Sequence, residues 1–98
     1  MTEVVVRSVT RAGTADRRAG LVAFLALEYG ELALDSVVLR RTLDSRYVLA
    51  FPQRRDRAGR AHAYVKPLSD TSRKEIERRV LAQLNIEQLD APEEVDDA

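Results

Sequence analysis

The sequence YVLAFPQRRDRAGR, residues 47–60, decides how this chain folds. Its apolar, β-prone half ends at Pro52, which has no N–H to donate to a strand ladder and so marks the end or the edge of a strand. Gly59 permits the positive φ angle of a tight turn. The stretch therefore predicts a hairpin whose tip carries Arg54, Arg55, Arg57 and Arg60.

The charge of this tip distinguishes it from an ordinary surface turn. The guanidinium group of arginine is planar and permanently charged, and it matches the geometry of phosphate groups and base edges. Many hairpin tips are charged only because they are solvated, yet Asp56 is the one acid within this cluster. The density of positive charge favours a surface that binds a polyanion.

Outward from the hairpin, β-prone segments precede a single helical one. The segments with strand character span residues 3–10, 20–28, 32–41, 46–51 and 60–66, and residues 11–16 are expected to be a loop. In residues 70–85, Ile76, Val80 and Leu84 form an apolar stripe, and Ser72 with Glu75 has the spacing of a capping box. The chain is therefore predicted to be an α+β domain, with a small antiparallel sheet of about five strands followed by one C-terminal helix.

The second predicted strand, residues 20–28, is apolar on both faces. Strict alternation places Leu21, Ala23, Leu25 and Leu27 on one face, and Val22, Phe24 and Ala26 on the other. A strand with one solvated face would alternate more cleanly, and one helix cannot cover both faces. This pattern favours a homodimer or an exchange of strands between chains; the alternative is a long loop folded over the second face.

Composition limits the function classes that remain. A chain of 98 residues forms one small domain, and with no cysteine and a single histidine we expect neither a disulfide nor a metal or cofactor site. No apolar run approaches the roughly 20 residues that span a bilayer, and a basic-then-apolar signal peptide is not recognised. A cytoplasmic location without membrane contact is the expectation.

The zero net charge conceals a strong asymmetry. Residues 1–79 hold all 16 basic residues and ten acidic ones, a net charge of +6, whereas residues 80–98 hold six acidic residues and no basic one. We expect a domain over residues 1–85 and an acidic, disordered tail over residues 86–98. Two roles remain open for the tail. Its carboxylates compete with the phosphates of a nucleic acid for the basic tip, or the tail only increases solubility and does not contact the domain.

The ordered set of features from Phe51 to Ile76 resembles the septation protein SpoVG family. It comprises the apolar strand ending in FPQRR at residues 51–55, the turn at Gly59, the Pro67-Leu68 strand end, and the polar run 69–73 that leads into the helix. The LDSV strand at residues 34–37 also fits. This chain departs from the family at residues 42–45, where a glycine-rich turn is usual, at Arg57, which replaces a proline, and at Lys66, which replaces a common histidine.

The resemblance implies a small dimeric α+β protein that binds DNA site-selectively, can bind RNA, and regulates gene expression with effects on septation, cell division and sporulation. It assigns nucleic-acid contact to the basic pair after the proline and to the start of the helix. The expected interface comprises Gln53, Arg54, Arg55, Arg57, Arg60, Thr71, Ser72, Arg73 and Lys74. At the helix start, free N–H groups can hold a phosphate, although capping by Ser72 and an ion pair of Arg73 with Glu77 are the plain alternatives.

An enzyme is not expected, and neither is a small-molecule substrate. His62 lies between two alanines with no catalytic motif around it, and no glycine-rich phosphate loop is present. Tyr64 is the best candidate for base stacking, but core packing is the expectation. Two hypotheses remain: a dimeric transcription regulator that binds nucleic acid, and a protein-interaction module acting on a cell-division or regulatory partner.

Overall fold

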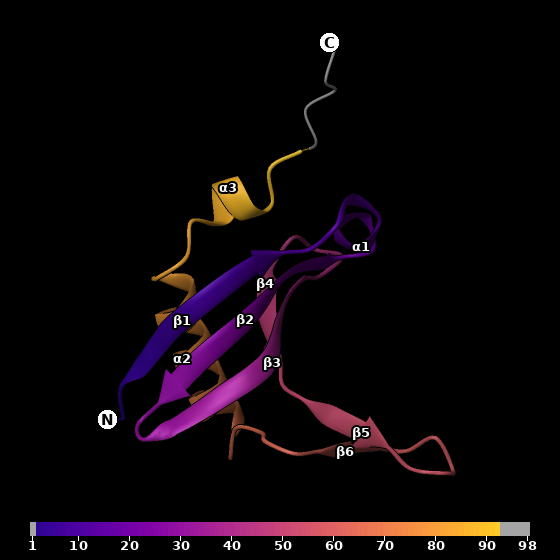
Figure 1. Ribbon diagram of the computed structural model, residues 1–98, viewed down its shortest axis with the longest axis vertical. Helices are drawn as coiled ribbons and strands as arrows, with labels where there is room; N and C mark the ends of the chain where they lie inside the picture. Colours follow the sequence, from indigo (N-terminus) through magenta and orange to yellow (C-terminus); the bar gives the residue numbers. More distant parts are fainter. Residues whose placement is uncertain (1, 93–98) are drawn as a thin grey trace.

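The computed structural model describes residues 2–92 and confirms the α+β class. In chain order the elements are β1 (Val4–Arg11), α1 (Thr14–Arg18), β2 (Leu21–Tyr29), β3 (Leu32–Arg41), β4 (Tyr47–Ala50), β5 (Gln53–Arg55), β6 (Ala61–Ala63), α2 (Asp70–Leu81) and α3 (Ile86–Leu89). The first four strands form an antiparallel meander in the order β1-β2-β3-β4 (Figure 1). Each predicted strand is therefore present, but the single five-stranded sheet is not.

The last two strands form a separate two-stranded ribbon that projects from the body of the molecule (Figure 1). Pro52 lies between β4 and β5 and prevents the ladder of β4 from continuing. β5 and β6 contain no large apolar side chain, and all their residues are exposed. Since the ribbon has no apolar face to bury against the main sheet, it extends away from it.

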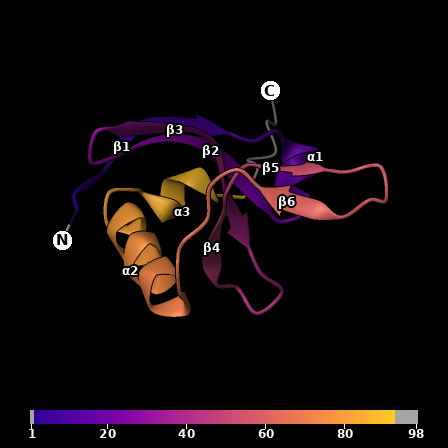
Figure 2. The ribbon, with the colours of Figure 1, turned by 90° about the horizontal axis from the view of Figure 1, so that it is seen from below.

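One face of the four-stranded sheet carries the core. Figure 2 shows α2 and α3 on the same side of the sheet. The predicted apolar stripe is confirmed, because Val80 of α2 is fully buried, and Ile76 of α2 and Leu84 just after the helix pack against the core. The helix α3 was not predicted, and its residues Ile86 and Leu89 pack against the same core. These two helices cover one face of the sheet, whereas α1 contacts β2 near the end of the sheet.

A bulge in β2 changes which residues reach the open face of the sheet, the one opposite α2 and α3. The register of β2 against β3 shifts between Leu21 and Ala23, so Val22 and Ala23 are both fully buried rather than on opposite faces. Phe24 pairs with Val38 and remains 42% exposed. The predicted alternation was wrong at Val22, and the open face of β2 is less apolar than the sequence indicates.

The ends of α2 also differ from the prediction. The helix begins at Asp70, and the hydroxyl of Ser69 accepts the N–H of Ser72, so Ser69 rather than Ser72 is the N-cap. The helix ends at Leu81 instead of near residue 85, because Asn85 caps the separate helix α3 by accepting the N–H of Gln88. The chain changes direction here, which lets α3 pack against the core.

The segment around α3 is held to the sheet by Asp90, where disorder was predicted. The carboxylate of Asp90 accepts a hydrogen bond of 2.6 Å from Arg41 and one of 2.5 Å from Tyr47. Arg11 donates to the carbonyl groups of Leu89 and Ala91. The prediction of disorder was wrong for residues 86–91, which form α3 and the contacts just described, and residues 93–98 of the predicted tail lie outside the described residues.

Two side chains of α2 and its C-terminal extension occupy the outer edges of the sheet. Gln83 accepts the N–H of Val6 and donates to the carbonyl of Val4, both at 2.8 Å, along the edge of β1. Glu77 accepts the N–H of Leu49, also at 2.8 Å, on the edge of β4. These contacts satisfy backbone groups that would otherwise offer a site for an added strand.

The loop predicted at residues 11–16 contains the first turn of α1, a short helix that sequence patterning missed. Within this helix, Arg17 is buried and donates to the carbonyl of Ala12, while the Arg17 carbonyl accepts from Arg41. Within residues 2–92, none of the helices is both long and apolar enough to cross a membrane.

Candidate nucleic-acid interface

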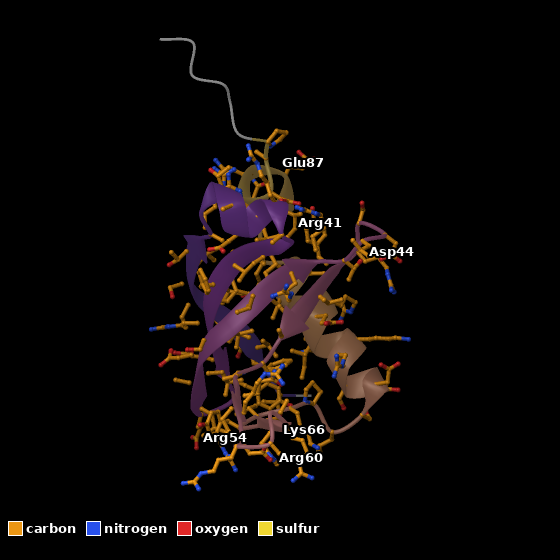
Figure 3. The ribbon with its side chains drawn as sticks, turned by 90° about the vertical axis from the view of Figure 1, so that its right-hand side faces the viewer. Arg41, Asp44, Arg54, Arg60, Lys66 and Glu87 are labelled. Atoms are coloured by element: carbon orange, nitrogen blue, oxygen red, sulfur yellow. The ribbon has the colours of Figure 1, made fainter. Side chains whose placement is uncertain are left out.

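The basic hairpin, residues 53–63, comprises β5, β6 and the turn between them. Gln53 pairs with Ala63, Arg54 with His62, and Arg55 with Ala61. Figure 3 shows Arg54 and Arg60 at the end of the molecule opposite to Glu87. The sequence placed four arginines at the tip, but the structure places Arg54 and Arg55 in the first strand of the ribbon and Arg57 and Arg60 in the turn.

Asp56 organises the turn of this hairpin. One carboxylate oxygen accepts the backbone N–H groups of Ala58 and Arg60, each at 2.9 Å. The other oxygen lies 2.8 Å from Nε2 of His62 and 3.4 Å from Nε of Arg60. The hydrogen bond with His62, followed by those from the backbone of Arg60 and Ala58, holds the pKa of Asp56 below its ordinary value of 3.8. The only acid of the cluster is therefore part of its framework.

The arginines of the hairpin divide into two kinds. Arg55 donates to the carbonyl of Gly59 at 2.7 Å, and Arg60 is paired with Asp56, so both contribute to the shape of the turn. The positive φ angle of Gly59, 81°, is part of this shape. Arg54 and Arg57 are exposed and, within residues 2–92, make no side-chain hydrogen bond or ion pair. These two guanidinium groups are available to an external anion.

The predicted contacts at the start of α2 are more heterogeneous. The hydroxyl groups of Ser69 and Ser72 hydrogen-bond to each other at 3.0 Å, and Lys74 pairs with Asp70 at 3.2 Å. Thr71 is exposed. The expected ion pair of Arg73 with Glu77 is not formed, because Glu77 accepts the N–H of Leu49 instead. Arg73 is therefore the residue of this helix start that remains exposed and, in the described chain, without an ionic partner.

A groove joins the base of the basic hairpin to the start of α2. It has a volume of about 340 Å³ and is lined by Leu49, Ala50, Phe51, Gln53, Ala63, Val65, Lys66, Pro67 and Arg73. Two predicted site residues, Gln53 and Arg73, thus lie on one surface although 20 positions separate them in the sequence. Lys66 lies between them along the chain, lines the same groove, and was missed as a site residue.

An apolar hollow adjoins the groove at Lys66. Its volume is about 170 Å³, and its lining comprises Val4, Leu27, Tyr29, Leu34, Phe51, Val65, Lys66, Pro67, Leu68, Ser72 and Ile76. Phe51, Val65, Lys66 and Pro67 belong to both the hollow and the groove. Tyr64, which was predicted to pack in the core, is instead 67% exposed beside these residues.

Chemically, this end of the molecule is a cationic surface with an apolar depression. None of the residues that line the groove or the hollow is acidic. Within residues 2–92, no three histidine, cysteine or carboxylate side chains are grouped so as to hold a metal ion. The arrangement supports binding of a polyanion through exposed guanidinium and ammonium groups.

Comparison with protein-family models, with curated proteins and with solved structures found no match for this chain in any of the three.

Proposed function

We propose that this protein is a nucleic-acid-binding regulator of gene expression, acting as a homodimer in the cytoplasm. The observation that carries the proposal is the pair of exposed guanidinium groups, Arg54 and Arg57, on a ribbon that projects from the body. Lys66 and Arg73 extend this charge along the groove at the base of the ribbon. The resemblance to the SpoVG family supports the same function and suggests processes such as septation, cell division or sporulation as its setting.

The hairpin has the chemistry for both parts of nucleic-acid recognition. Arg54 and Arg57 would contact phosphates, which supply most of the affinity and its dependence on salt. An amide such as that of Gln53, in the first strand of the ribbon, can recognise an exposed adenine edge. Phosphate contacts position a protein on its target, while base contacts specify the sequence.

Homodimerisation is supported by the open face of the sheet. Phe24 is 42% exposed there, next to Val38, and the described chain supplies no helix to cover it. Both edges of the sheet are occupied by Gln83 and Glu77, so pairing of two subunits through these edges is disfavoured. A face-to-face contact that buries Phe24 would present two basic hairpins in one assembly. Light scattering should report about twice the monomer mass of 11.0 kDa.

The test of function is a titration of the purified protein with labelled oligonucleotides and with an acidic peptide. We expect binding to DNA or RNA that weakens steeply with salt, and much weaker binding to the peptide. The variant Arg54→Ala/Arg57→Ala should lose most of the affinity. The matched control is Arg18→Ala/Arg40→Ala, which removes two exposed arginines outside the hairpin and groove. Tight binding of the peptide without binding of any oligonucleotide would identify a protein-interaction module instead.

A further inference from the structure

We infer that the apolar hollow beside Lys66 receives one unstacked base of a single-stranded nucleic acid whose phosphates lie along the neighbouring groove. The inference rests on the proposed function and specifies its ligand class. The protein would then have a base-binding site formed mainly by residues outside the arginine cluster, and it would bind single strands in preference to duplexes.

The position of the hollow relative to the groove is the first argument. The two depressions adjoin each other, since both are lined by Phe51, Val65, Lys66 and Pro67. A ligand that occupies both must be anionic where it meets Lys66 and Arg73, and apolar and compact a short distance away. A nucleotide has this combination, since its phosphate is charged and its base presents an apolar face.

The size and lining of the hollow are the second argument. Its volume of about 170 Å³ is below the range of roughly 300–1,000 Å³ typical of sites for drug-sized ligands, so it suits a single ring system. The walls include the aromatic side chains of Tyr29 and Phe51, and the polar side-chain groups in the lining are the hydroxyls of Tyr29 and Ser72 and the ammonium of Lys66. Such a lining accepts a base mainly through its face, which makes the recognition tolerant of sequence.

The exposed apolar side chains at the mouth are the third argument. Leu68 is 98% exposed and lines the hollow, Val65 is 36% exposed, and the neighbouring Tyr64 is 67% exposed. Apolar groups gathered at the mouth of a cavity are typical of a binding site. An exposed aromatic ring beside a cationic groove is also the usual platform for base stacking on single strands.

The accessibility of the base decides between single and double strands. In a duplex every base is paired and stacked, and extruding one costs a few kcal/mol. A single strand offers its bases without that cost. The charge of the neighbouring groove favours a nucleic acid over an apolar protein segment as the ligand. Lys66 and Arg73 line this groove, and no carboxylate does.

The experiment compares two exposed leucines. Leu68→Ser removes an apolar side chain at the mouth of the hollow, and Leu43→Ser removes one that is equally exposed, at 108%, in the turn between β3 and β4. The probes are a labelled thymidine oligomer, an abasic oligomer of the same length and charge, and a duplex of that length. Circular dichroism checks that both variants are folded.

We expect the wild-type protein and Leu43→Ser to bind the thymidine oligomer several-fold more tightly than the abasic oligomer and the duplex. Leu68→Ser should lose this preference while keeping its affinity for the abasic oligomer and its salt dependence, because the phosphate contacts are intact. Equal binding of thymidine and abasic oligomers by the wild-type protein would overturn the base site and leave the proposed function standing. Failure to bind any oligonucleotide would instead overturn the proposed function. A fall in the assembly mass of Leu68→Ser would overturn the inference by assigning the hollow to a subunit interface.

Discussion

Asp56 shows at the scale of a single residue how a charge pattern becomes a shape. In the sequence it is one acid among four arginines, and it appears only to reduce their charge. In the structure its carboxylate holds the N–H groups of Ala58 and Arg60 and contacts His62. Through these bonds it closes the turn that presents Arg57, so its removal should affect the hairpin more than the body.

The first prediction concerns this turn. Asp56→Ala removes the acceptor for two backbone N–H groups, and each lost bond costs about 1 kcal/mol in an exposed setting. We expect faster hydrogen exchange at the amides of residues 58–62, with unchanged exchange in β2 and β3. Asp35→Ala, at an exposed acid in β3, serves as the control. Unaltered exchange in the hairpin of Asp56→Ala would show that the turn forms without this carboxylate.

Glu75 gives a second prediction, which concerns pH. Hydrogen bonds from Arg78 and then Arg79 lower the pKa of Glu75 from 4.5 to about 2. Because the pKa is lower in the folded state than in the unfolded state, the two ion pairs stabilise α2 fully at pH values above the ordinary pKa of 4.5. That contribution is lost as the pH falls from 4.5 towards about 2. Titration of the Glu75 side-chain carboxyl carbon by NMR should give a midpoint near 2; a midpoint near 4.5 would contradict these ion pairs in solution.

At the scale of elements, the strands and the core face of α2 could be predicted, because their apolar residues recur with the period of the element. The bulge that buries Val22 could not, since it arises from the pairing of β2 with β3 rather than from local sequence. The helix α3 was missed because acidic neighbours obscured Ile86 and Leu89, which pack on the core. The separation of β5 and β6 from the main sheet follows from Pro52 and from the lack of apolar side chains, both of which are visible in the sequence.

The candidate site was predictable to a similar extent. Composition identified the arginines, but it could not separate Arg54 and Arg57 from Arg55 and Arg60, because that distinction depends on Asp56 and on the carbonyl of Gly59. The convergence of Lys66 and Arg73 on one groove depends on the path of the chain through Pro67, and no local pattern encodes it.

The attachment of α3 gives a third prediction. Burial alone would raise the pKa of Asp90, but the hydrogen bonds from Tyr47 and Arg41 outweigh it, and the pKa is lowered. Asp90→Asn removes the charge that balances Arg41, whose side chain is only 28% exposed. We expect a loss of about 1–3 kcal/mol in the free energy of unfolding, measured by urea denaturation. Glu87→Gln, at an exposed acid of the same helix, should change it by less than about 0.5 kcal/mol; equal effects would contradict the role of Asp90.

At the scale of the whole molecule, the basic hairpin and the helix α3 lie at opposite ends. The basic hairpin and α3 are separated along the longest dimension of the molecule, which is 47 Å (Figure 1). The six residues that follow Pro92 can span no more than about 20 Å even when fully extended. This arrangement disfavours competition between the acidic C-terminal residues and phosphates at the hairpin of the same chain.

The fourth prediction follows from this separation. Removal of residues 93–98 leaves α3 and Asp90 in place, whereas a deletion from residue 87 would also remove the contacts that hold α3. At physiological salt, where the Debye length is about 8 Å, the shortened chain should bind an oligonucleotide as tightly as the complete one. Fluorescence anisotropy measures this directly. A several-fold gain in affinity on truncation would mean that the acidic residues do reach a binding surface.

The dependence of binding on salt tests the central claim most directly. For a single strand, each phosphate that the protein neutralises contributes about 0.7 to the slope of the logarithm of the binding constant against the logarithm of salt concentration. If Arg54 and Arg57 each contact a phosphate, Arg54→Ala/Arg57→Ala should reduce the magnitude of this slope by about 1.4. Arg18→Ala/Arg40→Ala should retain the wild-type slope. A slope that is the same in the wild-type protein and in the hairpin variant would contradict the assignment of the basic hairpin as the nucleic-acid interface.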